Sequence, residues 1–369
     1  MKRSGTSSVS MKGHIQADDC LSFPACEINY FTPVSIESLV YQLSDGLGRR
    51  ISYLRVSVVD SCNLRCVYCM PSSGIRFTKH GDIMSADEIG MIVRAAASLG
   101  TTAVRLTGGE PLTRPDIAEI AAQVSSDPRV NDVPLSTNGI FLQGVASQLH
   151  AAGVTRVNVS VDSLKPERFR SITRGGELNR VLEGMNEASE AGMWPVKMNT
   201  VLMKGVNDDE LAELTRFALD HSYPLRFIEM MPLKSNVSFQ PELFFPAMRA
   251  KAMLEKEFTL RPSSSGNGSG PAVYYDVDGY DTPIGFITPL SGNFCDRCNR
   301  VRITSTGKLR MCLFGDAMVD LVSVIRDGGG VDDVARLIRN SITLKPERHH
   351  LSIGKTSSET LEAMSQIGG

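Results

Sequence analysis

Residues 62–69 read CNLRCVYC and directly follow an apolar run over residues 53–59. The cysteines Cys62, Cys66 and Cys69 are spaced C-x3-C-x2-C, and three thiolates at this spacing can hold three corners of a cubic iron-sulfur cluster. The fourth iron then has no protein ligand, so it can bind a small molecule and pass an electron to it. The alternative is structural zinc, which takes four ligands, whereas this segment offers three cysteines and no histidine before His80.

Short β-branched runs alternate with helical patterns from about residue 50 to residue 232, which is typical of βα units and a parallel sheet. The predicted strands are 53–59, 103–107, 133–137, 156–161, 196–201 and 225–229, and the helical patterns are 89–99, 117–124, 142–152, 177–192 and 209–220. Ser85, with Glu88 at the capping-box position, begins the first helix, and Gly100 ends it. A complete eightfold barrel needs roughly 250 residues. We therefore expect an α/β fold, a partial (βα)6 barrel of the TIM type that is open on one side.

A second cysteine triplet lies near the C-terminus, where Cys295, Cys298 and Cys312 are spaced C-x2-C-x13-C. Three thiolates without a nearby histidine favour a second cluster with one open iron, although zinc with a distant fourth ligand is an alternative. Around this triplet we expect an α+β module with a small hairpin at 273–277 and 284–288, and helices at 248–257, 317–326 and 331–340. Residues 263–270 are rich in Ser and Gly and indicate a turn or linker.

The composition excludes several classes of protein. The 39 Lys and Arg residues against 41 Asp and Glu give a net charge of −2, so no overall positive field recruits nucleic acid. No apolar run is long enough to span a membrane, and the first fifty residues lack a signal-peptide pattern. We expect a cytoplasmic protein in which clustered cysteines bind metal, while Cys20 and Cys26 in the N-terminal extension are incidental.

The first triplet, with the aromatic Tyr68 before its last cysteine, resembles the signature of the radical S-adenosylmethionine enzymes. In that family the open iron chelates S-adenosylmethionine, and one electron splits it to give a radical that takes a hydrogen atom from the substrate. The resemblance implies that Tyr68, Gly109 of the motif GGEP, Ser160 and Met231 contact S-adenosylmethionine. Without the family context, GGEP is a common turn, Ser160 ends a strand, and Met231 is a core residue.

Residues 294–302 (FCDRCNRVR) and 312–315 (CLFG), with further motifs in the same order from residue 47 onward, are similar to the GTP 3′,8-cyclases of molybdenum cofactor biosynthesis. The resemblance implies two [4Fe-4S] clusters, S-adenosylmethionine as cosubstrate, and conversion of GTP to 3′,8-cyclo-7,8-dihydro-GTP. It also implies an external one-electron donor, transfer of the product to cyclic pyranopterin monophosphate synthase, no membrane partner, and a homodimer as a possible state. The implied catalytic residues are Cys62, Cys66, Cys69, Arg300, Arg302, Gly368 and Gly369.

A triphosphate needs cations, and guanidinium groups hold phosphate oxygens in pairs. Basic residues in or beside the strand-end and cysteine motifs could meet in one cavity, although any single Arg is usually a surface residue. The resemblance implies that GTP is contacted by Arg55, Arg105, Ser136, Lys197, Arg300, Val301 and Arg302, and the charge argument adds Arg226. The expected domains are a flexible extension (1–46), the radical S-adenosylmethionine barrel (47–232), the second-cluster and GTP module (233–345), and a tail (346–369) whose last residues enter the active site.

Two rival functions follow from the same residues. A radical enzyme that modifies peptides can also carry C-terminal cluster cysteines, and a nucleotide-binding assay separates it from a GTP cyclase. A zinc-stabilised nucleic-acid-binding protein is the non-enzymatic rival, and the net charge of −2 without a basic stripe counts against it. A brown colour after anaerobic purification, which iron-sulfur clusters give, would exclude it.

Overall fold

Six parallel strands form the middle of the sheet, as the alternating pattern predicted. Their bounds differ from the predicted ranges only at the ends, and they are β1 (Tyr53–Ser57), β2 (Ala103–Thr107), β3 (Pro134–Thr137), β4 (Arg156–Ser160), β5 (Lys197–Leu202) and β6 (Leu225–Glu229). The computed structural model describes residues 42–232, 241–263, 270–292 and 294–349, together with Met364 and Gln366. Cys20, Cys26, Gly368, Gly369 and most of the Ser/Gly-rich stretch lie outside the described residues.

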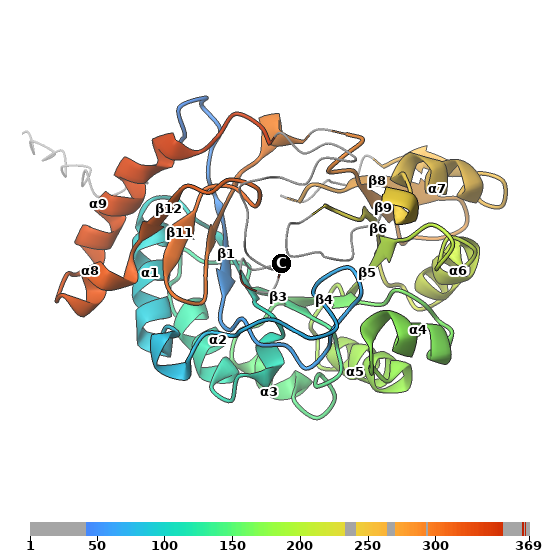
Figure 1. Ribbon diagram of the computed structural model, residues 1–369, viewed down its shortest axis with the longest axis horizontal. Helices are drawn as coiled ribbons and strands as arrows, with labels where there is room; N and C mark the ends of the chain where they lie inside the picture. Colours follow the sequence, from blue (N-terminus) through green and yellow to red (C-terminus); the bar gives the residue numbers. More distant parts are fainter. Residues whose placement is uncertain are drawn as a thin grey trace, which may run out of the picture. The chain divides into compact units, whose positions relative to one another are not determined.

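The helices between these strands cover the outer face of the sheet (Figure 1). They are α1 (Ala86–Ser98), α2 (Ile117–Ser125), α3 (Ala146–Ala151), α4 (Pro166–Thr173), α5 (Leu178–Glu190) and α6 (Leu211–Asp220). The predicted capping box at Ser85 and Glu88 is present, and Gly100, after the end of α1, has a positive φ of 93°. The sequence did not reveal α4, because this short helix buries only Phe169, Ile172 and Thr173 and has no long apolar period.

The barrel is open, as predicted, because strands from the C-terminal part continue the sheet at both edges instead of closing it. The full order is β12-β11-β10-β1-β2-β3-β4-β5-β6-β9-β8-β7. The added strands are β7 (Leu260–Pro262), β8 (Val273–Val277), β9 (Ile284–Ile287), β10 (Arg300–Ile303), β11 (Lys308–Arg310) and β12 (Met318–Asp320). Both β10 and β9 run parallel to their barrel neighbours, β1 and β6. The second cysteine triplet is thereby brought beside β1.

The predicted hairpin exists, since β8 and β9 are antiparallel. The predicted helix at 317–326 was wrong in its first part, because residues 318–320 form β12 against β11 and the helix α8 (Val322–Arg326) begins only afterwards. Asp320 accepts a hydrogen bond from the Ser323 backbone N–H at 3.0 Å, and this contact favours a helix start at that point. The remaining helices, α7 (Ala247–Leu254) and α9 (Val331–Ser341), lie where the sequence placed them.

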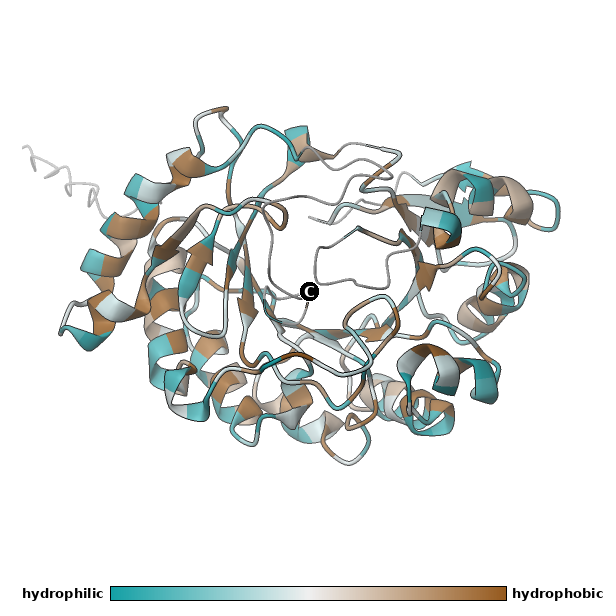
Figure 2. Cartoon of the chain, viewed as in Figure 1, coloured by the Kyte–Doolittle hydropathy of each residue, from teal (hydrophilic) through white to brown (hydrophobic). Residues whose placement is uncertain are grey.

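The core fills the space between the helices and the outer face of the sheet. On β1 the side chains of Leu54 and Val56 belong to this core, whereas Tyr53 and Arg55 alternate with them and line the inner pocket. Figure 2 shows apolar faces of the helices turned toward the sheet and polar faces turned away. Because core and pocket side chains alternate along the strands, polar and charged side chains are collected on the inner face of the barrel.

Among the described residues no helix is both long enough and apolar enough to cross a bilayer.

Candidate active site

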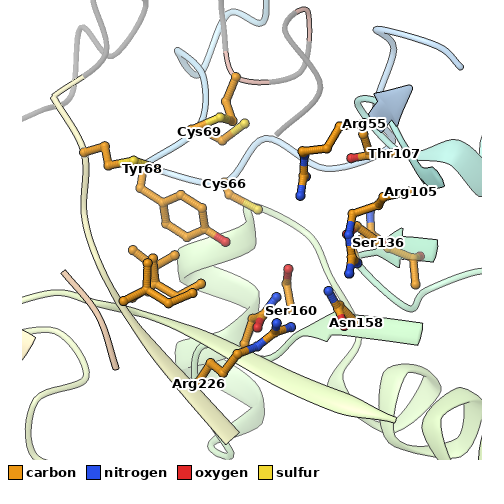
Figure 3. A pocket seen from close by; sticks show the side chains of 18 of the residues that line it. Arg55, Cys66, Tyr68, Cys69, Arg105, Thr107, Ser136, Asn158, Ser160 and Arg226 are labelled. Atoms are coloured by element: carbon orange, nitrogen blue, oxygen red, sulfur yellow. The ribbon is translucent and has the colours of Figure 1, made fainter. Parts of the chain in front are cut away.

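One pocket inside the open barrel collects residues from every barrel strand and from both cysteine-containing parts of the chain (Figure 3). It is lined by the first triplet, by four of the predicted arginines and by polar residues at strand ends. Its lining includes Arg55, Cys62, Cys66, Tyr68, Cys69, Arg105, Gly109, Ser136, Ser160, Arg226, Met231 and Arg300. Met364 of the C-terminal tail and Pro271 also line it. The other predicted GTP contacts, which are Lys197, Val301 and Arg302, do not line this pocket.

The first cysteine loop is held against α4, the helix that the sequence did not reveal. Backbone N–H groups of Arg65 and Val67 donate to carbonyls of Thr173 and Ile172 at 3.1 and 2.9 Å. Arg174, in the left-handed conformation (φ 55°), donates to the carbonyls of Arg65 and Met70. The position of this loop is therefore fixed by tertiary contacts as well as by its own sequence.

The glycines of GGEP have a role that the sequence did not predict, because they pack against the chain itself. A Cβ added to Gly109 would lie 2.1 Å from the Ser61 carbonyl oxygen, and one on Gly108 would lie 2.2 Å from the Val59 carbonyl oxygen. Both positions must therefore be glycine for the turn to touch the start of the cysteine loop. Gly109 still lines the pocket with its backbone.

Glu110 does not offer its carboxylate to a ligand. Its oxygens accept from the Thr137 hydroxyl (2.7 Å) and from the Leu112 and Asn138 backbone N–H groups (3.0 and 2.7 Å). Burial raises the pKa of Glu110 to about 7 despite these hydrogen bonds. The side chain ties the turn after β2 to the end of β3, so its role is structural.

Tyr68 is fixed by a residue that the sequence did not single out. Its hydroxyl donates to Oδ2 of Asp162 at 2.8 Å, while Oδ1 accepts from the Val201 backbone N–H at 2.8 Å. Burial raises the pKa of Asp162 to about 6. Asp162 thus orients the aromatic ring beside the cysteines from the end of β4, and the alternation of strands alone could not indicate this contact.

The first triplet fits a group that needs three thiolates. All six cysteines of the two triplets are free. All three thiols line the same pocket. Burial raises the pKa of Cys66, and the charges of Cys69, Asp162 and Cys62 add to this effect. A positive centre stabilises neighbouring thiolates, and the irons of a cluster would supply it.

The second triplet has the same character. Cys295 begins the 3-10 helix η5 (Cys295–Arg297), Cys298 directly follows it, and Cys312 follows β11. Burial raises the pKa of Cys295; a backbone hydrogen bond from His349 opposes this effect, and the charges of Cys312 and Cys298 add to it. Burial opposes ionisation of Cys298 as well, yet Lys345 and Arg300 bring its pKa below the ordinary value. This set also suits a cluster.

Arg105 is held in position by two neighbouring side chains. It is 4% exposed, and it donates to the Tyr53 hydroxyl at 2.7 Å and to Ser136 Oγ at 3.0 Å. Ser136 therefore lines the pocket and also orients the arginine. Burial lowers the pKa of Arg55 far below its usual range, and the charges of Arg302 and Arg105 add to this effect. Cations from β1, β2 and β10 thus repel one another across a small space.

Arg226 extends this positive region along the pocket wall (Figure 3). Lys197 does not line the pocket, but it is close enough to Arg226 for the Arg226 charge to act on it. Arg226 is 8% exposed, and burial lowers its pKa to about 10. Burial and the charge of Arg226 lower the pKa of Lys197 to about 7. The Lys197 ammonium lies 5.5 Å from the ring centre of Tyr274, a residue of β8 that the sequence did not indicate.

The three predicted residues of strand β10 do not all face the same side of the sheet. Val301 is 3% exposed and belongs to the hydrophobic core, so its side chain does not face the pocket. Arg300 and Arg302 point to the opposite face because side chains alternate along a strand. Arg302 is 9% exposed, and burial lowers its pKa to about 10, with Arg300 adding to the effect.

Two asparagines in the pocket wall were also missed. Asn158 on β4 and Asn199 on β5 each have a buried side-chain oxygen with no hydrogen-bond partner in the part of the chain that the structure describes. Buried polar atoms are normally satisfied, so these oxygens indicate a polar ligand. Ser160 and Met231, both predicted, lie at the ends of β4 and just after β6 and line the same space.

Comparisons with known proteins place the chain among enzymes of one kind. Residues 56–218 match the family model of the radical SAM superfamily, and residues 223–351 match that of Molybdenum Cofactor Synthesis C. The GTP 3′,8-cyclase of Pelotomaculum thermopropionicum is 44% identical over 328 residues, which are 89% of this chain and 100% of that protein. The GTP 3′,8-cyclase of Geobacter sulfurreducens is 41% identical over the same shares of both chains.

Solved structures give the same fold at low identity. Streptococcus suis SuiB bound to S-adenosylmethionine has a TM-score of 0.56 at 14% identity, over 77% of this chain and 68% of that chain. This likeness concerns the fold alone. Because curated relatives match over their whole length, the chain belongs to the family of GTP 3′,8-cyclases, within the radical SAM superfamily.

Proposed function

We propose that the chain is a lyase that converts GTP to 3′,8-cyclo-7,8-dihydro-GTP, the first step toward molybdopterin. The observation that carries this proposal is a group of four arginines that share one pocket with the first cysteine triplet. Arg105 and Arg226 are buried, and Arg55 and Arg300 are half-buried. Neighbouring cations repel one another, so this pocket suits an anion with several charges. A nucleoside triphosphate is such an anion.

Two [4Fe-4S] clusters and S-adenosylmethionine complete the site. Cys62, Cys66 and Cys69 hold the first cluster, which with S-adenosylmethionine supplies the radical chemistry when bound. Tyr68, the Gly109 backbone, Ser160 and Met231 line the adjoining space and contact S-adenosylmethionine. Cys295, Cys298 and Cys312 would hold the second cluster, which would supply a binding site for the guanine base.

The chain's own groups position GTP for reaction. Arg55, Arg105, Lys197, Arg226, Arg300 and Arg302 bind the triphosphate, and Ser136 adds a hydroxyl while orienting Arg105. Val301 offers main-chain atoms only, since its side chain lies in the core. The buried walls exclude water from the reacting atoms. The Arg105 guanidinium can pair with phosphate without moving far, because Tyr53 and Ser136 already hold it in place.

The assignment of segments and partners belongs to the same proposal. Residues 47–232 form the radical S-adenosylmethionine barrel, residues 233–345 carry the second cluster, and residues 346–369 form a tail that reaches the pocket, where Met364 lies. An external one-electron donor reduces the clusters. The product passes to cyclic pyranopterin monophosphate synthase, and a homodimer is a possible state.

The test is one anaerobic turnover of the reconstituted protein with S-adenosylmethionine, dithionite and GTP that carries deuterium at ribose C3′. We expect GTP to be consumed and the deuterium to appear in 5′-deoxyadenosine. The matched control is the Cys62→Ala/Cys66→Ala/Cys69→Ala protein, which should form no 5′-deoxyadenosine. A protein that cleaves S-adenosylmethionine but neither binds GTP nor takes up the label would instead fit the peptide-modifying rival.

A further inference from the structure

Lys345 is a buried cation whose place no sequence motif indicated. It follows α9 and the 3-10 helix η6 (Ile342–Leu344), and it is 7% exposed. Its Nζ donates to the carbonyl oxygens of Arg300 at 2.8 Å and Met311 at 2.9 Å, and it lies 3.5 Å from Sγ of Cys298. The three N–H groups of the ammonium thus have three acceptors, all of them beside the second triplet.

These acceptors come from both halves of the triplet. Arg300 begins β10, two residues after Cys298, and Met311 directly precedes Cys312. One ammonium therefore ties the segment of the first two cysteines to the segment of the third. This is the arrangement expected of a residue that keeps three ligands at fixed positions around one cluster.

The segment that carries Lys345 is itself fastened. Arg49 donates to the carbonyl oxygens of Cys295 (2.9 Å), Pro346 (2.7 Å) and Glu347 (2.9 Å). The Arg49 charge is balanced by Asp45, whose carboxylate lies 2.6 Å from its Nε. Residues 345–347 are thus held on the second triplet by a second buried side chain, and Lys345 has little freedom to leave.

The charge of Lys345 is not balanced in this way. Within the described ranges, the ion pairs of lysines are those of Lys165 with Asp209 and Lys251 with Glu255. Reduction adds one negative charge to a cluster, and a buried cation nearby stabilises this reduced form. Hydrogen bonds to the ligand sulfurs act in the same direction. An ammonium next to Cys298 therefore raises the reduction potential of the group that the triplet holds.

We propose that Lys345 is a positioning residue that fixes the ligand geometry of the second cluster and raises its reduction potential. The inference depends on the proposed function only in taking the second triplet to hold a [4Fe-4S] cluster. Lys345 acts through the cluster and its ligands, and it touches neither GTP nor S-adenosylmethionine in this role.

The experiment isolates the second cluster in the full-length Cys62→Ala/Cys66→Ala/Cys69→Ala protein, reconstituted anaerobically with iron and sulfide. In this background we compare Lys345→Met, Lys345→Arg and, as the matched control, Lys308→Met, whose lysine is exposed on β11. Iron and sulfide are counted per chain, and the one-electron reduction of the cluster by dithionite is titrated by electron paramagnetic resonance. Circular dichroism of each protein before reconstitution reports folding.

We expect Lys345→Met to lower the equilibrium constant for reduction at least tenfold, a shift of about 59 mV to more negative potential for one electron. Lys345→Arg should recover at least half of this shift, and Lys308→Met should behave like the background protein. Failure of Lys345→Met to load iron, with a native circular dichroism spectrum and recovery in Lys345→Arg, would also support the proposal.

Unchanged iron content together with an unchanged potential in Lys345→Met would overturn the proposal, as would loss of the native circular dichroism spectrum, which would indicate a role in the fold as a whole. Binding of GTP to the background protein is measured in parallel. If the second cluster loads normally but GTP neither binds nor alters its spectrum, the proposed function fails while the effect of Lys345 on the potential can still be read.

Discussion

At the scale of one residue, the buried cation Arg226 lowers the stability of the ligand-free protein and favours binding of an anion. Its Nε and one terminal nitrogen have no hydrogen-bond partner among the residues that the structure describes. Burial, with the charges of Arg105 and Arg156, lowers its pKa, which means that the charged form is held at a cost. A phosphate ligand would explain the two nitrogens without a partner, since phosphate oxygens would accept hydrogen bonds from both.

Arg226→Met tests this account. We expect GTP affinity to fall about ten- to a hundredfold, because one charge-assisted contact contributes roughly 1.5 to 3 kcal/mol. The melting temperature of the ligand-free protein should rise, because an unbalanced buried charge is removed. Calorimetry of GTP binding and thermal unfolding measure the two effects. Arg261→Met, which removes an exposed arginine paired with Asp278, should change neither by much. A lower melting temperature for Arg226→Met would contradict the account.

Lys197 gives the site a dependence on pH. Its pKa in the folded protein is lowered to about 7 from 10.5, so the unfolded chain holds this proton more tightly. The contribution of Lys197 to stability therefore rises with pH between about 7 and 10.5, and it is least favourable below about 7. Bound phosphate reverses this preference, because it favours the charged ammonium.

We accordingly expect GTP binding near pH 8 to take up a proton at Lys197. Calorimetry in buffers of different ionisation enthalpy measures proton uptake directly. Lys197→Met should lose this uptake and weaken GTP binding, whereas any uptake by the phosphate groups of GTP itself should persist in the variant. Equal proton uptake by the two proteins would show that Lys197 keeps its charge in the free pocket.

The turn after β2 shows how two elements fix each other. The Gly109 backbone N–H donates to the Val59 carbonyl at 2.7 Å, and the Glu110 N–H donates to the Ser61 carbonyl at 2.8 Å. The glycine turn thereby sets the direction in which the chain leaves β1 and enters the first cysteine loop. Because a Cβ on Gly109 would collide with backbone atoms, no rotamer change could relieve the contact.

Gly109→Ala should displace the first cysteine loop while leaving the second triplet intact. We expect loading of the first cluster and cleavage of S-adenosylmethionine to be lost, so that about half of the iron remains after reconstitution. Gly81→Ala is the matched control, because an added Cβ there meets nothing within 4 Å. Full iron content in Gly109→Ala would show that the turn can move without disturbing the cysteines.

The elements that could be predicted from sequence are those with a repeated local pattern. The six barrel strands alternate or run apolar, and α1 has both a capping box and a glycine after its end, so local signals agree. Helix α4 and strand β12 were missed because each is short and stabilised mainly by its neighbours. Likewise, the pairing of β10 with β1 joins residues about 250 positions apart, which local patterns cannot indicate.

At the scale of the whole molecule, the chain forms its site by adding strands to both edges of one sheet. The cysteines and the arginines of the pocket were predicted because their residue types and motifs are visible in the sequence. Tyr53, Asp162, Asn158 and Tyr274 were not predicted, since their roles depend on contacts between distant strands. Val301 was predicted by resemblance, and only the register of β10 places its side chain in the core.

One described residue of the C-terminal tail belongs to the pocket. Gly368 and Gly369 lie outside the described residues, but Met364, only five positions before the end, lines the pocket. Residues without side chains can enter a narrow space, so the tail is proposed to help arrange the arginines that hold GTP. The alternative to a positioning role is that the tail is frayed, which is usual for glycines at a chain end.

Deletion of Gly368 and Gly369 should therefore abolish conversion of GTP while both clusters load and S-adenosylmethionine is still cleaved. Addition of one residue after Gly369 should have the same effect, because the tail would no longer fit. The measurements are iron per chain, 5′-deoxyadenosine formed and GTP consumed, each compared with the unaltered protein. A synthetic peptide with the sequence of residues 359–369 should restore turnover to the truncated protein if the tail acts as a positioning group. Normal GTP conversion by the truncated protein would instead mean that the tail has no part in the reaction, and the arginines must then be positioned by their strands alone.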